Sequence, residues 1–287
     1  MRRLVVVLVV VALALAAVAG FIVATRDTGG VEIRRDIAFK QVDGETLSLD
    51  AYLPTTEGPH PAVILIYGGG WIMGNKADWD AYGRYLAEQG FAAFALQYRL
   101  APAHPFPAAA DDVRDGTAWV REHALEFGID PARLGAVGGS AGGQLAALLA
   151  TEGSGPLDQG SRVAAAVAWA GPMDLHPSQF PAETQGYISA FLACAPANCR
   201  EDTIDAASPI DHLDASDPPM LIAHGDVDLL IPLNQAQRMD AALQAAGVPH
   251  QLLVVPGAGH DEKLLPGVFE PTTQFLREQL RQPSPLP

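Results

Sequence analysis

The sequence predicts an α/β fold in which a mostly parallel, eight-stranded sheet carries helices on both faces. Short, continuously apolar runs alternate with helical segments between about residues 30 and 280, which is the pattern of a parallel sheet with helical crossovers. Right-handed crossovers then place helices on both faces. No internal repeat or second domain is visible, so we expect one domain.

Eight segments have the pattern of strands. The first two alternate in polarity and are joined at Asp43-Gly44, a dipeptide typical of hairpin turns, so they predict the antiparallel edge of the sheet. The third strand, residues 61–67, is a continuous apolar run, as expected for a central strand covered on both faces. In order, the strands cover residues 31–40, 46–53, 61–67, 91–98, the run that ends at Gly138, 163–170, 219–223 and 250–255.

Helical segments lie between these strands and after the last of them. Gly90 and Gly247 each follow a helix as a C-terminal glycine cap. In order, the helices cover residues 78–89, 108–127, the Ala/Leu run 144–150, 233–246 and 268–280. Residues 175–218 have no periodicity and are rich in Pro, Ser and Ala, so they predict an irregular, lid-like insertion.

Residues 1–26 differ from the rest of the chain in composition. Leu4–Ala24 holds 21 residues without a charge, and as a helix it would span about 31 Å, enough for a hydrocarbon core of ~30 Å. Arg2 and Arg3 precede it and would stay on the inner side. We expect a membrane anchor, with a signal peptide cleaved after Ala17-Val18-Ala19 as the alternative. Either would place the domain of residues 27–287 outside the cytoplasm.

Charge and cysteine content narrow the functional classes. The formal net charge is −15 and no Lys/Arg-rich patch occurs, which argues against nucleic-acid binding. Cys194 and Cys199 lie in a loop-like segment, where an oxidising exterior would allow a local disulfide; we favour this over free thiols. Two thiols are too few for a metal site, and no His or acidic cluster stands nearby at ligand spacing.

The stretch from Arg133 to Gly143 has the layout of a nucleophile elbow. A short apolar strand leads through Gly138-Gly139-Ser140-Ala141-Gly142 into a helix, so Ser140 would lie on a tight turn beside a helix N-terminus. Side chains two positions before and after the serine would collide with the neighbouring strand and helix, so glycine is needed at both positions. The alternative interpretation is a glycine-rich strand-to-helix turn without chemistry.

A serine nucleophile needs a base, and the base needs an acid to orient it. In proteins with a nucleophile elbow, the acid follows the serine in the chain and the histidine comes last. Asp228, just after a buried strand, is the preferred acid, and Asp226 is the alternative. Whichever of the two is not the acid would form hydrogen bonds with backbone groups of the loop. His260 also follows a strand and is the preferred base. His224 is its strongest rival, but it precedes the acid.

The glycines of Tyr67-Gly68-Gly69-Gly70-Trp71 follow the third strand. They let the backbone approach a ligand closely, and together with the Ala141 N–H they would form an oxyanion hole. A phosphate cradle is the weaker alternative, because neither Gly-Lys-Ser/Thr nor a Gly-x-Gly-x-x-Gly that opens a helix is present.

Five segments in this order and spacing resemble α/β-hydrolases of the carboxylesterase kind, close to the hormone-sensitive-lipase-like esterases and to the bacterial feruloyl and acetyl-xylan esterases. The segments are Tyr67–Trp71; Tyr98–Pro102 with His104–Pro107 and Asp111-Asp112; Gly138–Gly142; His224-Gly225 with Asp228 and Pro232; and Gly257–His260. The resemblance implies Ser140 as nucleophile, Asp228 as acid and His260 as base.

The resemblance also implies the oxyanion donors, which fall on Gly68, Gly69 and Ala141. The family's loop usually begins with histidine where this chain has Tyr67, so we expect different hydrogen bonding there but the same backbone donors. The chain lacks a long N-terminal cap, so the roof of the pocket would come from residues 175–218.

The reaction implied is acyl transfer by a serine carboxylesterase that hydrolyses short-chain acyl or aryl esters outside the cytoplasm. The expected partner is a small-molecule ester, and no metal or organic cofactor is required. A serine peptidase or amidase of the same fold is the first alternative, because the same triad cleaves amides. A non-catalytic extracellular binding module is the second, although such proteins usually lose a triad member.

Overall fold

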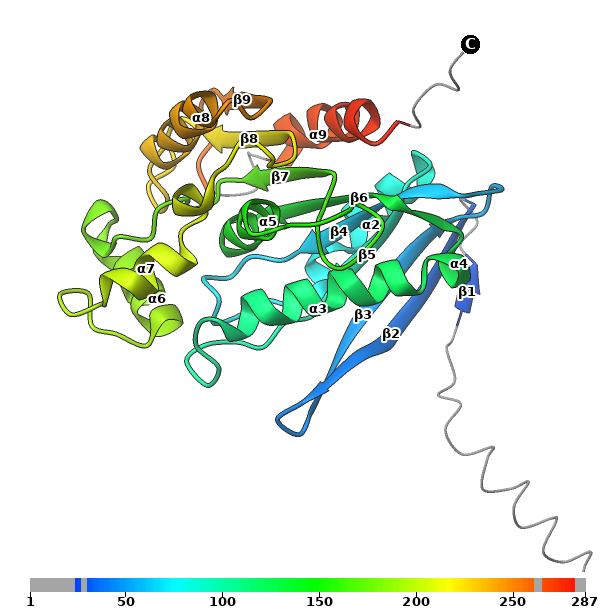
Figure 1. The fold of residues 1–287 in the computed structure, drawn as a ribbon, viewed down its shortest axis with the longest axis horizontal. Coiled ribbons are helices and arrows are strands. Elements are labelled where there is room, and N and C mark those ends of the chain that lie inside the picture. Colours follow the sequence, from blue (N-terminus) through cyan, green and yellow to red (C-terminus); the bar gives the residue numbers. More distant parts are fainter. Residues whose placement is uncertain (1–23, 27–29, 261–264, 282–287) are drawn as a thin grey trace, which may run out of the picture.

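The computed structural model describes residues 24–26, 30–260 and 265–281 (Figure 1). Within these residues one sheet has the strand order β1-β2-β3-β5-β4-β6-β7-β8-β9. The pairs from β1 to β5 are antiparallel, and all pairs from β5 through β4 to β9 are parallel. The prediction of an α/β fold with a mostly parallel sheet is therefore confirmed.

All eight predicted strands form: β2 (Val31–Val42), β3 (Glu45–Pro54), β4 (His60–Ile66), β5 (Ala92–Leu96), β6 (Ile129–Gly139), β7 (Ala165–Trp169), β8 (Met220–Gly225) and β9 (His250–Val255). A ninth strand, β1 (Ala24–Arg26), pairs with β2, so the predicted strand number was one short. The rest of the predicted apolar helix, residues 4–23, lies outside the described residues. No helix in the described part of the chain has the length and apolar character of a membrane span.

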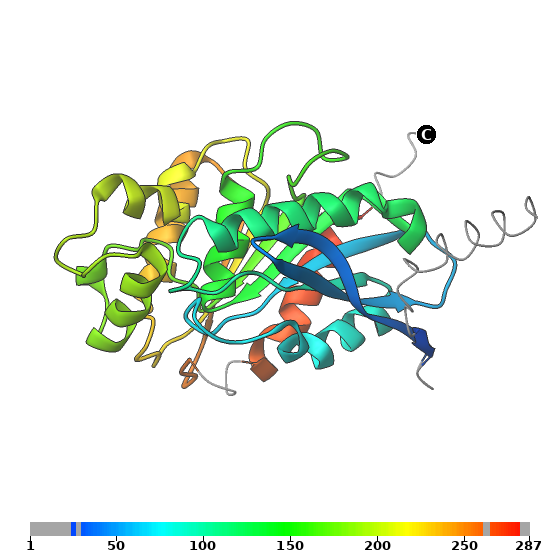
Figure 2. The same cartoon turned by 90° about the horizontal axis from the view of Figure 1, so that it is seen from below.

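Helices cover both faces of the sheet (Figure 2), with α3, α5 and α8 on one face and α2 and α9 on the other. The helices outside the insertion are η1 (Lys76–Trp79), α2 (Asp80–Glu88), α3 (Ala108–Glu122), α4 (Ala124–Phe127), α5 (Ala141–Thr151), α8 (Asn234–Ala246) and α9 (Leu265–Gln279). The helix predicted over 108–127 is thus two helices, with His123 between them. Strands β5, β7 and β8 are buried at every position, because helices pack on both of their faces.

The insertion at residues 175–218 is largely helical, not irregular as predicted. It contains η2 (Pro177–Gln179), α6 (Ala182–Leu192), α7 (Glu201–Ala207) and η3 (Pro209–His212). These helices have few turns and prolines stand at several of their starts, so no helical period develops in the sequence. A disulfide joins Cys194 and Cys199 between α6 and α7. In Figure 1 the insertion lies beyond the end of the sheet toward which β7 points.

Candidate active site

Ser140 lies at the turn between β6 and α5 with φ 56° and ψ −122°, a left-handed φ that is rare outside glycine. Its N–H donates to the Trp169 carbonyl oxygen at 2.7 Å. A Cβ at Gly138 would lie 1.9 Å from the Gly142 carbonyl oxygen, and a Cβ at Gly142 would lie 2.0 Å from the Ile66 carbonyl oxygen. Backbone atoms leave no room for either side chain, so both flanking glycines are required, as the sequence predicts.

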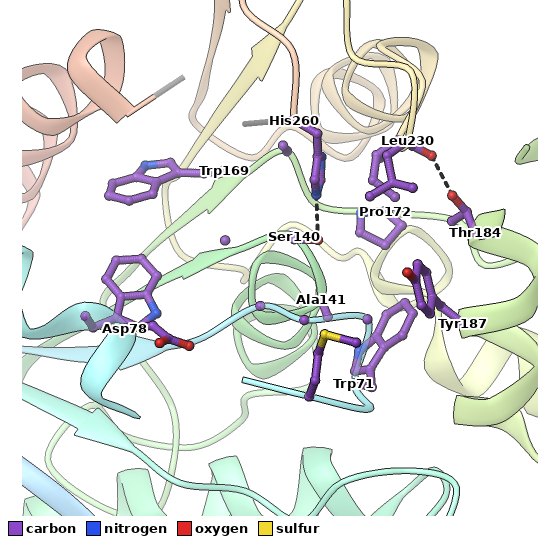
Figure 3. Close-up of a pocket in the computed structure, with 18 of the residues that line it drawn as sticks. Trp71, Asp78, Ser140, Ala141, Trp169, Pro172, Thr184, Tyr187, Leu230 and His260 are labelled. Atoms are coloured by element: carbon purple, nitrogen blue, oxygen red, sulfur yellow. Dashed lines mark hydrogen bonds between the residues drawn. The ribbon is translucent and has the colours of Figure 1, made fainter. Parts of the chain in front are cut away.

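Three predicted side chains meet at this turn. The Ser140 hydroxyl is 2.8 Å from His260 Nε2 (Figure 3), and His260 Nδ1 is 2.7 Å from Asp228 Oδ2. Ser140 follows β6, Asp228 follows β8 and His260 follows β9, so all three stand at the carboxyl ends of parallel strands. An alcohol, an imidazole and a carboxylate in contact in this order have the arrangement of a nucleophile, a base and an orienting acid.

The Asp228 carboxylate is held by hydrogen bonds on both oxygens. Its Oδ1 accepts the N–H groups of Leu230 and Ile231, each at 2.9 Å, and Oδ2 faces His260. Burial opposes ionisation, but hydrogen bonds from His224 and His260 outweigh it and hold the pKa of Asp228 well below its usual range. Asp228 is therefore ionised and can stabilise a protonated imidazole.

The two rival residues have other partners. Asp226 is exposed and accepts the Gly257 N–H at 2.7 Å, a contact that supports the loop after β9. His224 is fully buried, donates from Nε2 to the Ile231 carbonyl oxygen at 2.8 Å and lies 3.4 Å from Asp228 Oδ2. Sequence reasoning treated His224 only as a rival base and missed its contact with Asp228. The four-residue spacing between the two was the available signal.

The glycine loop after β4 runs directly beside Ser140. A Cβ at Gly68 would lie 2.8 Å from the Gly139 carbonyl oxygen and 3.1 Å from the Ser140 Cβ, while Gly69 has a φ of +109° that favours glycine. Ala141 is the first residue of α5, so its N–H has no acceptor within the helix. All these residues line one cavity with Ser140. Backbone N–H groups from two loops thus flank the hydroxyl.

Tyr67 occupies the place where the resembling esterases usually have histidine. Its ring stacks on Tyr98 with 4.2 Å between the centroids. The Tyr67 hydroxyl donates to the Tyr98 carbonyl oxygen at 3.1 Å, and the Tyr98 hydroxyl donates to the Tyr67 carbonyl oxygen at 2.9 Å. Burial raises the pKa of both phenols, so they remain neutral donors. This reciprocal pair anchors the start of the glycine loop.

The cavity around Ser140 has a volume of about 480 Å³ and a largely apolar wall. Helix α6 supplies part of its roof, as expected for residues 175–218. The Tyr187 ring lies against Gly70, where a Cβ would be 2.8 Å from the ring, and the Thr184 hydroxyl donates to the Leu230 carbonyl oxygen at 2.7 Å (Figure 3). The roof therefore contacts both the glycine loop and the loop that contains Asp228 and Leu230.

A second histidine–carboxylate group lies outside the cavity. His176 Nδ1 is 2.5 Å from Asp174 Oδ1 and its Nε2 is 2.8 Å from Glu201 Oε1. Ligand atoms of His176, Glu201 and Asp205 lie within 4.8 Å of one another, a spacing that could hold a metal ion. Because both ring nitrogens already have carboxylate partners, we describe the group as an ion-pair network that joins Asp174, after β7, to α7.

This network predicts a pH-dependent contribution to stability. The hydrogen bond to Glu201, with Asp174 adding to it, raises the pKa of His176, so its contribution is fully present below about pH 6.5 and is lost as the pH rises through the raised pKa. We expect His176→Gln to lower the melting temperature more at about pH 5.5 than at about pH 9. Thermal unfolding of both proteins at the two pH values tests this, and an equal loss at both would contradict it.

The elbow serine, its contacts with histidine and aspartate, and their position at the carboxyl ends of a parallel sheet define an α/β-hydrolase. The family model described as BD-FAE matches residues 49–243, and the chain belongs to this family. The resemblance to α/β-hydrolase esterases is thereby confirmed.

Curated relatives and solved structures agree with this family. The probable carboxylic ester hydrolase LipM of Mycobacterium tuberculosis is 31% identical, over 77% of this chain and 54% of LipM. The ethyl acetate hydrolase of Pseudomonas putida is 31% identical, over 84% of this chain and 79% of the relative. The esterase Est2 of Thermogutta terrifontis is 28% identical with a TM-score of 0.72, covering 90% of this chain and 95% of Est2. The chain spans about half the length of LipM and of esterase LipC of M. tuberculosis.

Proposed function

We propose that this chain is a serine carboxylesterase in which Ser140 is the nucleophile, His260 the general base and Asp228 the orienting acid. The observation that carries the proposal is the unbroken line of contacts from the Ser140 hydroxyl through His260 to Asp228, at 2.8 and 2.7 Å. Relatives named as carboxylic ester hydrolases and ethyl acetate hydrolase support ester bonds as the target.

The mechanism follows from these positions. Ser140 Oγ attacks the ester carbonyl carbon while His260 Nε2 takes its proton, and Asp228 stabilises the imidazolium. The carbonyl oxygen becomes an oxyanion that accepts hydrogen bonds from the N–H groups of Gly68, Gly69 and Ala141. The C–O bond then breaks and the alcohol leaves with the proton from His260. Water, activated by the same imidazole, hydrolyses the acyl-enzyme and restores the serine.

The size and wall of the cavity support short acyl or aryl esters as substrates. We expect kcat/KM to be higher for p-nitrophenyl acetate and butyrate than for the dodecanoate, because about 480 Å³ must hold both halves of the ester beneath the roof of α6. The matched anilide, p-nitroacetanilide, tests the amidase alternative. Faster anilide than ester cleavage would contradict the proposal, and so would a preference for the dodecanoate.

We further propose that the hydrolase domain acts outside the cytoplasm, held by its N-terminal segment. The apolar run Leu4–Ala24 and the Cys194–Cys199 disulfide support this, because such bonds persist in oxidising compartments. Protease accessibility of the domain in intact cells, with lysed cells as control, tests the proposal. Full protection in intact cells would contradict it.

A further inference from the structure

Among the described residues that line the cavity, Asp78 supplies the one carboxylate, and none is Lys or Arg. Asp78 belongs to η1 and is exposed. Its Oδ2 accepts the Asn75 N–H at 3.0 Å, and among the described residues no basic side chain forms an ion pair with it. Within the described part of the chain, a negative charge without a cationic partner therefore borders the cavity that Ser140 lines.

Aromatic rings form the rest of this side of the cavity. Trp79, Tyr82, Trp169 and Phe269 all line it, and Trp169 packs against the other three at centroid distances of 5.1, 5.0 and 5.6 Å. In Figure 3, Asp78 and Trp169 lie on one side of Ser140, and Tyr187 and Thr184 of the roof lie on the other. We call the first side the Asp78 compartment. Aromatic faces attract cations, and so does a carboxylate.

Two hydrogen-bonding groups of this wall are turned into the protein. The Trp169 indole N–H donates to Thr272 Oγ1 at 2.9 Å, and the Tyr82 hydroxyl lies 3.4 Å from Thr273 Oγ1. Neither of these two groups is free to bind the hydroxyl groups of a sugar or other polyol, whereas a quaternary ammonium group needs no hydrogen-bond partner. The wall thus suits a cation better than a neutral polyol.

We propose that the Asp78 compartment selects esters that carry a fixed positive charge, with a quaternary ammonium group seated between Asp78 and the aromatic wall. This inference rests on the proposed esterase function and adds the charge class of the substrate. The formal net charge of −15 acts in the same direction, because it attracts cationic and repels anionic esters.

The test compares two esters of the same shape. Acetylcholine and 3,3-dimethylbutyl acetate differ in that a quaternary nitrogen replaces a quaternary carbon, and acid release in a pH-stat measures kcat/KM for both. We expect the full chain to favour acetylcholine by about tenfold at low salt, with the ratio falling as ionic strength rises. Glycerol monoacetate serves as a neutral substrate that bears hydroxyl groups.

The variant Asp78→Asn removes the charge and keeps an amide oxygen that can accept the Asn75 N–H. We expect the ratio of kcat/KM between acetylcholine and its carbon analogue to fall to about one. The matched control is Glu122→Gln, which removes the same charge from an exposed position on α3 outside the cavity and should leave the ratio as in the wild type.

The outcomes separate this inference from the proposed function. Equal kcat/KM values for acetylcholine and 3,3-dimethylbutyl acetate in an active wild-type protein would overturn the proposed charge selection. They would leave the proposed esterase function unaffected. A decrease in kcat/KM of Asp78→Asn that is confined to glycerol monoacetate would also overturn the charge selection. The carboxylate would then be shown to bind hydroxyl groups. No turnover of 3,3-dimethylbutyl acetate or of p-nitrophenyl acetate would instead reject the esterase function itself.

Discussion

Ser140→Ala is expected to abolish hydrolysis of p-nitrophenyl acetate, lowering kcat by on the order of 10⁶-fold, as in other hydrolases that lose a triad serine. The variant removes the oxygen that forms the acyl-enzyme and leaves His260 without its partner at 2.8 Å. Alanine has one atom fewer than serine and adds no contact at the turn, so the fold should persist. Initial rates, together with the far-UV circular dichroism spectrum, measure both effects.

A fluorophosphonate probe provides an independent measurement. It should label the wild type and fail to label Ser140→Ala, and Ser154→Ala, at an exposed position, serves as the matched control that keeps the label. A related structure, T. terrifontis esterase 2, is phosphonylated by sarin, which makes this probe chemistry appropriate. Near-normal esterase activity or labelling in Ser140→Ala would remove the assignment of the nucleophile.

Asp228→Asn is expected to lower kcat by about 10⁴-fold. Because Oδ1 of Asp228 accepts two backbone N–H groups, the amide oxygen of an asparagine would take that position. Its NH₂ group would then face His260 Nδ1, which accepts only when the ring proton is on Nε2. In that tautomer Nε2 can no longer take the serine proton, so the loss is chemical and not a matter of folding.

Asp226→Asn is the matched control, since its side chain serves only the Gly257 N–H in the described structure and an amide oxygen can accept the same bond. We expect this variant to keep kcat within about threefold of the wild type, as a surface substitution does. Steady-state kinetics of both variants decide between the two acids. A large loss in Asp226→Asn with none in Asp228→Asn would transfer the role of acid to Asp226.

The strands and the nucleophile elbow could be predicted from the sequence because their determinants are local. A strand buried on both faces must be apolar along its length, as β7 is, and the backbone around Ser140 tolerates only glycine at positions 138 and 142. The order of serine, acid and histidine along the chain then limited the acid to Asp228 or Asp226 and favoured His260 over His224, and the resemblance to carboxylesterases favoured Asp228.

The insertion and the environment of the acid could not be predicted in the same way. Helix α6 has 11 residues and its buried positions depend on contacts with distant loops, such as Thr184 with Leu230. The Tyr67–Tyr98 pair joins residues 31 positions apart. The four-residue spacing of His224 and Asp228 leads to a contact only because the turn after β8 brings the two side chains together. Such contacts arise from tertiary packing and leave no period in the sequence.

The double contact of helix α6 has a consequence for engineering. Tyr187 contacts the glycine loop with the proposed oxyanion donors, and the Thr184 hydroxyl is hydrogen-bonded to the loop of Asp228, the proposed acid. One helix therefore supports two parts of the proposed catalytic site. Grafting this segment from another esterase would reset the geometry of both loops along with the shape of the pocket. A replacement of α6 that is meant to change substrate selectivity would therefore also change the turnover rate, so the two properties must be redesigned together.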